Sequence, residues 1–349
     1  MSGGVDSSVA AGLMVEAGHE VIGVTLKLWS GPNGEAPTAG CCTVTDAEDA
    51  RRVAAQLDIP YYVLNYTEEF KEGVVDRFVA DYLNGRTPNP CVECNRTIKF
   101  SRLLDRASQL GCDLLVTGHY ARTVHSKGRW QLLKGIDPDK DQSYVLYMLG
   151  QTELAKVRFP LGSLTKTETR QRAAELGLRT AAKPDSQDIC FAGVAGYRSF
   201  LHSQVPTDQR PGAIVDETGR VVGSHQGITG FTVGQRKGIG AAVGAPRYVT
   251  KVDAVTSTVT IGRARDLEAG GLRLENLCWV SSPPDEFSEL AIKIRYRGGA
   301  HPCRVVGDVV LFADPVKAVA AGQTGVLYYD DRVVGGGTIA ESLPVGALV

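Results

Sequence analysis

The first half of the chain alternates between helical and strand-like patterns of apolar residues. In residues 7–17 the apolar side chains recur at helical spacing and Gly18 ends the segment, whereas residues 21–28 form a β-branched, apolar run typical of a strand. The alternation continues, with Asp46 as a possible cap of the next helix: helices are predicted over 46–57, 68–83 and 98–110, and strands over 61–64 and 114–117. This order of elements predicts an α/β fold built on a doubly wound parallel sheet with helices on both faces.

The pattern changes after about residue 206, where Gly, Val and Thr dominate and period-two segments appear. Strands are predicted over 248–252 and 258–261, and further along over 291–296, 305–312 and 325–329. These signals predict a small central β-rich domain followed by a C-terminal domain that resembles a β-barrel. The predicted domains therefore span residues 1–207, 208–270 and 271–349.

Composition narrows the class of protein without selecting a function. The chain has 349 residues, of which 43% are hydrophobic, and its 38 basic and 39 acidic side chains leave a net charge of −1. Overall charge therefore gives no indication of a nucleic-acid partner, and any RNA site must come from local patches. No segment suits a signal peptide or a membrane span, so we expect a cytoplasmic protein with no membrane partner.

The strongest local signal is a glycine-containing string at the start of the chain. Two adjacent glycines allow a tight turn whose amides can approach a ligand, and the polar residues that follow can begin a helix whose N-terminus favours bound phosphate. Two glycines alone are more typical of an ordinary helix cap, but the complete string favours phosphate binding. It lacks the Gly-Lys-Ser/Thr of a Walker loop. The predicted nucleotide-binding string is Ser2, Gly3, Gly4, Val5, Asp6, Ser7 and Ser8.

This string resembles the pyrophosphate loop of the N-type ATP pyrophosphatases. The resemblance implies that ATP is cleaved to AMP and pyrophosphate, and that AMP passes to a carbonyl or carboxyl oxygen. Such activation is chemically useful because a carbonyl oxygen is a poor leaving group, whereas an adenylated oxygen departs with AMP. The implied cofactors are ATP and Mg²⁺, with Asp6 as a candidate ligand of the metal.

Two of the eight cysteines lie in polar strings that suggest chemistry. Cys94 ends a proline-containing loop at residues 85–95, close to a predicted helix start whose dipole can lower a thiol pKa, and Cys190 lies in a polar loop at residues 185–191. Paired cysteines in a reducing compartment are more often catalytic, redox-active or metal-binding than structural. We interpret Cys112, Cys278 and Cys303 as small buried hydrophobic residues and assign nothing to Cys41 and Cys42.

These strings, with residues 117–121, 140–144 and 231–238, resemble the tRNA-specific 2-thiouridylases over essentially the whole chain. The resemblance implies that Cys190 receives sulfur as a persulfide and that Cys94 is its catalytic partner. It also implies a transfer-RNA substrate, thiolated at its wobble uridine, and a persulfide donor such as a cysteine desulfurase or a relay protein. The implied contacts are Leu26 and Gly118 with the nucleotide, Asn89, Pro90 and Cys91 with the target base, and His119, Lys140, Asp141, Gln142, Arg295, Tyr296 and Gln323 with the tRNA.

Position 91 departs from the commonest form of that family, which has aspartate there. A thiol is a poorer acid or base than a carboxylate, so the role of this position changes with Cys91. The change also creates a Cys91-x-x-Cys94 pair, which together with Cys190 offers three thiolates for zinc or an iron–sulfur cluster. We favour the simple dithiol, with no metal ligands, because a fourth ligand is missing and both Cys94 and Cys190 already have a chemical use.

Two alternatives remain open at this level. Another pyrophosphate-loop synthetase would need no cysteine pair, which Cys94 and Cys190 argue against. A non-catalytic RNA-binding or sulfur-carrying protein gains some weight because a strand normally precedes such a loop, whereas the sequence begins at Met1 directly before it. We expect the missing strand to reflect a displaced start or a trimmed chain. The route of sulfur, by direct persulfide attack or by released hydrosulfide, also stays open.

Overall fold

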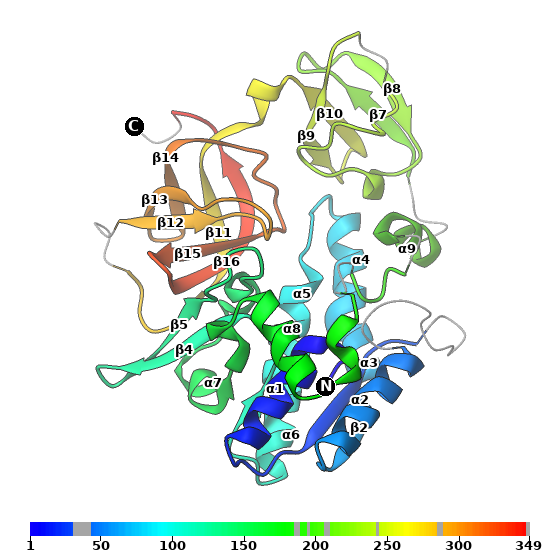
Figure 1. Cartoon of the computed structure of the whole chain (residues 1–349). Helices are drawn as coiled ribbons and strands as arrows, with labels where there is room; N and C mark the ends of the chain where they lie inside the picture. Colours follow the sequence, from blue (N-terminus) through cyan, green and yellow to red (C-terminus); the bar gives the residue numbers. More distant parts are fainter. Residues whose placement is uncertain are drawn as a thin grey trace. The chain divides into compact units, whose positions relative to one another are not determined.

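The computed structural model describes residues 1–30, 43–184, 189–193, 196–205, 210–241, 244–284 and 289–346. These described residues cluster into two compact units, each discontinuous in sequence (Figure 1). The first unit contains Met1–Val75, Pro90–Tyr197 and Asp331–Val333, and the second contains Asp76–Asn89, Arg198–Asp330 and the described residues from Val334 onward. The segment Asp76–Asn89 therefore belongs with the later part of the chain, although its sequence lies within the first half. The domain boundaries expected near residues 207 and 271 stay predictions.

The first unit is an α/β fold with parallel strand pairs, which confirms the predicted class. Strands β1 and β2 pair in parallel, with Gly23 opposite Tyr61, and β3 and β6 pair in parallel, with Leu115 opposite Val157. The helices and strands of this part are α1 (Val5–Glu16), β1 (Gly23–Lys27), α2 (Val44–Gln56), β2 (Tyr61–Asn65), α3 (Thr67–Phe70), η1 (Lys71–Val75), α5 (Pro90–Glu93), η2 (Cys94–Arg102), α6 (Leu103–Gln109), β3 (Leu115–Val116), β4 (Ala121–Ser126), β5 (Arg129–Lys134), η3 (Ser143–Leu146), α7 (Gln151–Lys156), β6 (Val157–Arg158), η4 (Pro160–Ser163), α8 (Lys166–Glu175) and η5 (Arg179–Ala182).

A buried apolar cluster holds α1 against its neighbours in the first unit. Val9 of α1, Val53 of α2 and Ala173 of α8 lie in this cluster, and each is almost completely buried. Burial of such side chains stabilises the fold by roughly 1.5–3 kcal/mol for each Val- or Leu-sized group. The cluster therefore fixes the N-terminal end of α1, where the predicted phosphate loop lies.

The cap of α2 corrects the expectation for Asp46. Thr43 is the N-cap, and its hydroxyl oxygen accepts a hydrogen bond from the Asp46 amide at 3.1 Å. The Asp46 carboxylate in turn accepts hydrogen bonds from the Thr43 amide and hydroxyl, at 3.2 and 2.6 Å. This capping box uses Asp46 as the third helical residue, so the helix begins two residues earlier than predicted.

The helices predicted over 68–83 and 98–110 are present but are wrong in their starts and continuity. The first begins at Thr67 and contains the π-helical stretch η1 before it continues as α4 (Asp76–Leu83) in the second unit. The second begins at Pro90, since a proline at the first helical turn gives up no needed N–H group. It then runs through the π-helical η2 into α6. Helical periodicity cannot reveal π-helical turns, which are frequent near functional sites.

A β-hairpin in the first unit has no counterpart in the sequence prediction. Strands β4 and β5 pair antiparallel, and Lys127 and Gly128 at the turn both have positive φ angles, as a tight hairpin turn requires. Within the same unit, Arg332 and Val333 pair with β5. The hairpin was missed because its strands carry mixed polar and apolar residues without clean alternation.

The second unit contains a small sheet and a closed barrel, as predicted. Strands in the sheet follow the order β8-β7-β10-β9. In the described part of the chain, the barrel strands follow the order β11-β14-β13-β12-β15-β16 and close by pairing of β11 with β16. Besides α4, this part contains α9 (Gly196–Gln204), β7 (Gly212–Val215), β8 (Val221–His225), η6 (Ile228–Gly230), β9 (Tyr248–Asp253), β10 (Thr258–Gly262), η7 (Ala264–Leu267), β11 (Glu268–Trp279), β12 (Leu290–Lys293), β13 (His301–Val306), β14 (Val309–Lys317), β15 (Thr324–Tyr329) and β16 (Arg332–Leu343).

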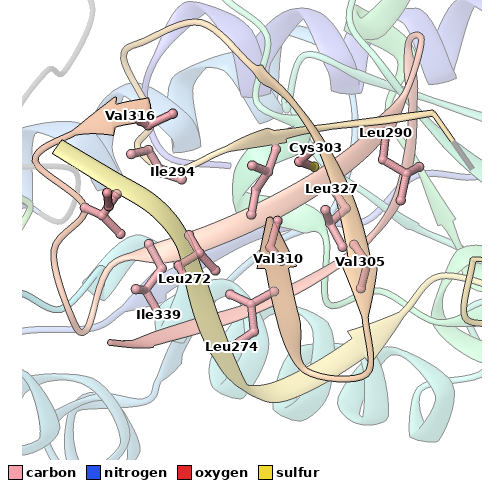
Figure 2. Packing of buried hydrophobic residues seen from close by; sticks show 13 residues of the cluster. Leu272, Leu274, Leu290, Ile294, Cys303, Val305, Val310, Val316, Leu327 and Ile339 are labelled. Carbon is pink, nitrogen blue, oxygen red and sulfur yellow. The ribbon is translucent and has the colours of Figure 1, made fainter. Parts of the chain in front are cut away.

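Aliphatic side chains from all around the barrel fill its interior. Figure 2 shows Leu272 and Leu274 of β11 packed with Val310 and Ile339 from other strands, and each is nearly or fully buried. The single strand predicted over 305–312 is wrong, because Gly307 turns the chain with a φ of 62° and separates β13 from β14. Apolar periodicity continues across this turn, which hid it from the pattern.

Gly162 provides a test of close packing in the first unit. A Cβ atom there would lie 1.7 Å from the carbonyl oxygen of Ala121, in the backbone of β4. We expect Gly162→Ala to lower the free energy of unfolding by about 1–3 kcal/mol, because η4 and β4 would have to separate. Gly299→Ala is the control, since a Cβ there meets nothing within 4 Å. Denaturant unfolding of both variants measures the difference, and equal stabilities would contradict the close approach.

Candidate functional site

The predicted phosphate loop wraps around the N-terminal end of α1. Gly3 has a φ of 69°, and a Cβ there would lie 2.2 Å from the carbonyl oxygen of Asp46. Gly4 is the N-cap of α1 and, among the described residues, no side chain caps this end of the helix. The Ser7 hydroxyl oxygen accepts a hydrogen bond from the Ser2 amide at 2.9 Å. The loop is thus folded tightly and leaves the first helical amides available to an anion.

Both remaining residues predicted to contact the nucleotide lie beside this loop. A Cβ on Gly118 would lie 2.8 Å from the Ser7 amide nitrogen, so the backbone at Gly118 passes directly against the loop. Leu26 lies on β1, next to Thr25, whose hydroxyl donates to the Met1 carbonyl oxygen at 2.6 Å. The strand β1 therefore runs next to the entry of the loop.

Asp6 is linked to a lysine that the sequence interpretation missed. The Lys166 ammonium lies 2.7 and 2.9 Å from the two carboxylate oxygens of Asp6, and the Tyr120 hydroxyl donates to the same carboxylate at 2.9 Å. The Asp6 side chain remains 35% exposed. A carboxylate has about four lone-pair positions, so Asp6 still has capacity for a metal ion or water beside these partners. A capping box at Thr165 and Glu168 marks the start of α8, but nothing local indicated that Lys166 would reach Asp6.

A second missed lysine holds the other side of the loop. The Lys183 ammonium lies 2.7 Å from carboxylate oxygens of both Asp46 and Asp49. Partial burial lowers the pKa of Lys183, but its hydrogen bonds to these carboxylates outweigh burial and raise the pKa above its usual value. The Arg170 guanidinium fixes the segment that carries Lys183 by donating to its carbonyl oxygen at 3.0 Å. Because Asp46 also packs on Gly3, this ion-pair network supports the shape of the loop.

Cys94 and Cys190 both lie in the first unit, on segments that share packing partners. Cys94 is buried at the start of η2, whereas Cys190 is half-buried. Phe191, the next residue, packs its ring 5.8 Å from the ring of Phe70. The elements α3 and η1 contact η2 in turn, and Gly73 lies against Thr97 there. Through α3 and η1, this packing connects the Cys190 segment to η2, whose first residue is Cys94.

The position of Cys94 alters the expected effect of the helix dipole. The helical segment starts at Pro90, so Cys91 occupies its first turn and Cys94 lies one turn further in. The helix dipole acts mainly within the first turn, so the position of Cys94 does not support the expected effect of the dipole on its thiol. The exposed thiol at position 91 is the one closest to the helix start. Residues 185–188 of the Cys190 string, and Cys41 and Cys42, lie outside the described residues.

The arrangement of the cysteines gives no support to a metal site. In the parts of the chain that the structure describes, which include Cys91, Cys94 and Cys190, no group of three or more His, Cys, Asp or Glu side chains is placed to hold a metal ion. The interpretation of these residues as three ligands of zinc or of a cluster therefore stays without structural support. The dithiol interpretation needs only Cys94 and Cys190.

Several residues predicted to face tRNA have their side chains committed to local structure. His119 is buried between the rings of Phe100 and Phe159, at 5.8 and 6.0 Å, and its Nδ1 lies 2.8 Å from the Thr117 hydroxyl. The buried Asp141 accepts hydrogen bonds from the amides of Gly135 and Ser143. These contacts show that His119 and Asp141 hold the loops around them.

The neighbours of Asp141 differ in their surroundings. The Gln142 amide oxygen accepts from the Tyr120 amide at 3.0 Å, and Tyr120 in turn binds Asp6. Gln142 thereby supports the phosphate loop indirectly, through Tyr120. Lys140, in contrast, is half-buried on the same segment.

The predicted tRNA contacts of the second unit lie at two places. Arg295 and Tyr296 are exposed after β12, where the Arg295 guanidinium donates to the Lys317 carbonyl and the Lys293 ammonium lies 5.9 Å from the Tyr296 ring centre. Gln323 is half-buried and donates to the carbonyl oxygens of Thr87 and Pro88. Asn89 follows directly in the same unit, whereas Pro90 and Cys91 belong to the first.

A glycine-turn loop at the N-terminus of a helix, beside parallel strands, is typical of a nucleotide-binding α/β domain. Residues 1–194 match the family model described as "tRNA methyl transferase HUP domain". Residues 198–263 match "tRNA methyl transferase PRC-barrel domain", and residues 269–339 match "Aminomethyltransferase beta-barrel domain". Among the described residues, none of the helices has the length and apolar character needed to cross a membrane.

Relatives match this whole arrangement, and they identify the family. The chain is 48% identical to the tRNA-specific 2-thiouridylase MnmA of Geobacter metallireducens, over 99% of this chain and 97% of the relative. It is 46% identical to the protein of the same name from Chloroflexus aurantiacus, over 98% and 97% of the two chains, and 47% identical to that of a Roseiflexus species, over 98% of each. The chain belongs to the family of tRNA-specific 2-thiouridylases, which confirms the predicted resemblance, and it is an enzyme of that family.

Burial of His119 predicts a pH dependence of stability. Burial, and secondarily the positive charge of Lys99, hold the pKa of His119 well below its usual value near 6.5, so the folded protein keeps this imidazole neutral. The unfolded chain takes up a proton below about pH 6.5, so the stability associated with neutral His119 is present above that pH and is lost as pH falls toward the folded-state pKa.

We expect His119→Asn, which can keep a polar contact with Thr117, to weaken this dependence. The free energy of unfolding should fall less steeply between pH 6.5 and pH 5 in the variant, by up to about 1.4 kcal/mol per pH unit. Denaturant titrations at a series of pH values measure the slope. His125→Asn is the control, since His125 lies near Trp130 in the exposed part of the β4–β5 hairpin. Identical slopes for the native protein and His119→Asn would refute this assignment.

Proposed function

We propose that this chain uses ATP to adenylate O2 of a uridine at the wobble position of tRNA and then replaces that oxygen with sulfur. The products are 2-thiouridine in the tRNA, AMP and pyrophosphate. One observation carries the proposal: the phosphate loop held by Gly3 shares a compact unit with the cysteine pair Cys94 and Cys190. Membership of the 2-thiouridylase family over nearly the full length supports it.

The loop residues suit the binding of a leaving pyrophosphate. The uncapped amides at the start of α1 point their partial positive charge at an anion, and Lys166 supplies a full charge at the same place. Gly118 lies against the loop and Leu26 lies on the strand next to its entry, so we assign both to the nucleotide. Magnesium, when bound, would offset phosphate charge, and the partly exposed carboxylate of Asp6 is the side chain suited to hold it.

The cysteine pair suits sulfur transfer from a persulfide. A donor protein, such as a cysteine desulfurase or a relay protein, would load Cys190 with a second sulfur atom. The terminal sulfur attacks C2 of the adenylated uridine, and AMP leaves with the original oxygen. The Cys94 thiolate then attacks Sγ of Cys190, which releases 2-thiouridine and forms a Cys94–Cys190 disulfide. A dithiol reductant restores both thiols, so the reaction belongs in a reducing compartment such as the cytoplasm.

Contacts with tRNA require a base that is turned out of its stack, because neither sulfur can reach C2 inside a stacked stem-loop. Exposed Arg295 and Tyr296 offer a charge and an aromatic face to the RNA. The family resemblance also assigns Asn89, Pro90, Cys91, His119, Lys140, Asp141, Gln142 and Gln323 to the RNA, and of these the buried His119 and Asp141 would act through the loops that they hold.

A reconstituted reaction tests the proposed function directly. The protein is incubated with ATP, Mg²⁺, a cysteine desulfurase, cysteine and unmodified tRNA, and the nucleosides are analysed by mass spectrometry. We expect ATP-dependent 2-thiouridine and one AMP for each thiolated base. AMP formation with a sulfur-free RNA product would instead indicate a different pyrophosphate-loop activity. RNA binding without AMP formation would indicate a non-catalytic protein.

Replacement of each cysteine distinguishes the relay from a purely structural role. We expect Cys190→Ser and Cys94→Ser each to lower 2-thiouridine formation at least 100-fold, because each removes a nucleophile that forms a covalent intermediate. Cys112→Ser, which changes a half-buried thiol elsewhere in the first unit, should keep full activity. ATP affinity, measured by calorimetry, should be equal in all three variants. Thiolation that survives the loss of Cys190 would rule out the persulfide relay.

Lys166 should contribute to nucleotide binding through its charge. We expect Lys166→Gln to weaken ATP affinity about 10- to 150-fold, because a charge-assisted contact to phosphate is worth roughly 1.5–3 kcal/mol. Arg172→Gln is the matched control, since Arg172 is a cation on the same helix that pairs with the exposed carboxylates of Glu16 and Glu175. Calorimetric titration with ATP and Mg²⁺ gives both affinities. Equal losses in the two variants would point to general charge and not to a contact from Lys166.

A further inference from the structure

The loop that leads to the target-base residues is fixed to the barrel inside the second unit. The Thr87 amide donates to the Ala321 carbonyl oxygen at 2.8 Å, and the Gln323 side-chain amide donates to the carbonyl oxygens of Thr87 and Pro88 at 2.8 and 3.4 Å. The turn that presents Gln323 is anchored in turn, because Ile339 of β16 donates to the Gln323 carbonyl and accepts from the Gly322 amide. The loop therefore rests on a well-held part of the barrel.

Steric fit at Gly322 makes this contact close as well as polar. Gly322 has a φ of 88°, and a Cβ there would lie 2.7 Å from the Thr87 amide nitrogen. Only glycine permits this approach of two backbones. The fit implies that the loop has one position on the turn and cannot slide along it.

An ion pair holds the loop one residue earlier. The Arg86 guanidinium binds the carboxylate of Glu275 on β11 and lies 4.0 Å from that of Asp81. Arg86 is only 27% exposed and Glu275 39%, so water screens this pair less than a fully exposed one. Glu275 on β11 and Gln323 in the turn before β15 thus hold the loop from two parts of the barrel.

The two prolines of the loop extend these restraints to the residues that follow. Pro88 and Pro90 have no N–H group, so this segment has few backbone donors of its own. Its carbonyl oxygens therefore take hydrogen bonds from other segments, and the Gln323 side chain provides one such donor. Each proline also fixes its own φ near −65°. With Thr87 and Pro88 held, little backbone freedom remains before Asn89, the first residue assigned to the target base.

We infer that Gln323 is a positioning residue that sets the place of the base-binding loop by donating its amide to the Thr87 and Pro88 carbonyls. This inference rests on the proposed function and differs from the expected direct contact between Gln323 and tRNA. A direct contact predicts that loss of the side chain weakens tRNA binding. A positioning role predicts that it loosens the loop in the absence of RNA and slows turnover on bound tRNA.

Gln323→Leu, which removes both donors at similar size, provides the test. In the RNA-free protein, hydrogen exchange of the peptide covering residues 84–92 should become faster, while barrel peptides keep their protection. Thiolation kcat should fall about 10- to 100-fold, as for a reacting group that is displaced by about an ångström. The tRNA dissociation constant should stay within about twofold of the native value. Gln323→Lys, which keeps a donor for the two carbonyls, should restore loop protection and part of the turnover.

A further variant and the choice of readout keep the outcomes separate. Glu275→Gln removes the Arg86 partner from the other side of the loop and should raise exchange of the same peptide to a smaller extent. Weakened tRNA binding with unchanged loop exchange in Gln323→Leu would overturn the inference in favour of direct contact. Unchanged turnover in this variant would also overturn the inference, because the loop would then need no positioning by Gln323. Exchange is measured without RNA or ATP, so it still reports on the loop if the native protein forms no 2-thiouridine and the proposed function fails.

Discussion

The close approach of the Gly3 backbone to the Asp46 carbonyl is the constraint on which the nucleotide site depends. It requires a glycine with a positive φ angle in the loop and a first turn of α2 that is fixed in position against that glycine. The capping box at Thr43 stabilises this turn, and the Lys183 ammonium binds the carboxylates of Asp46 and Asp49 in the same part of α2. The loop shape is therefore a property of packing between α1 and α2 as much as of its own glycines. A glycine pair without this support would be an ordinary flexible turn.

The parts of the structure that were predictable are those with local signals. The loop string, the alternation of helices and strands in the first half and the period-two segments of the barrel depend on nearest neighbours in sequence. The lysines of the site are different: Lys166 reaches Asp6 across 160 positions, and Lys183 reaches Asp46 across 137. A lysine in a polar helix start looks the same whether it faces solvent or a carboxylate, so no pattern could assign these two. The π-helical turns after Pro90 were hidden for a related reason, because they change the spacing that periodicity relies on.

The residues assigned to tRNA show why a family resemblance and a structure answer different questions. The resemblance predicts positions that contact tRNA, whereas the structure shows what their side chains touch without RNA. His119, Asp141 and Gln142 satisfy buried polar groups of the first unit, and Gln323 does the same for the loop at Thr87. A buried carbonyl or amide without a partner costs about 1–3 kcal/mol, so these side chains stabilise the loops in which they lie. Such residues can matter to RNA modification by shaping the surface that RNA meets.

The charges beside the loop are arranged as ion pairs and not as an excess of positive charge, in a chain whose net charge is −1. Two lysines beside the loop are paired with carboxylates: Lys166 with Asp6, and Lys183 with Asp46 and Asp49. These two lysines and three carboxylates sum to a charge of −1, and their pairing limits the repulsion and desolvation that unpaired charges would cause. Under the proposed function, a bound phosphate would compete with Asp6 for Lys166, and the Asp6 carboxylate would then be the side chain suited to hold a magnesium ion that offsets phosphate charge. In that case the one ion pair between Lys166 and Asp6 would supply both the cation for the phosphate and the carboxylate for the metal.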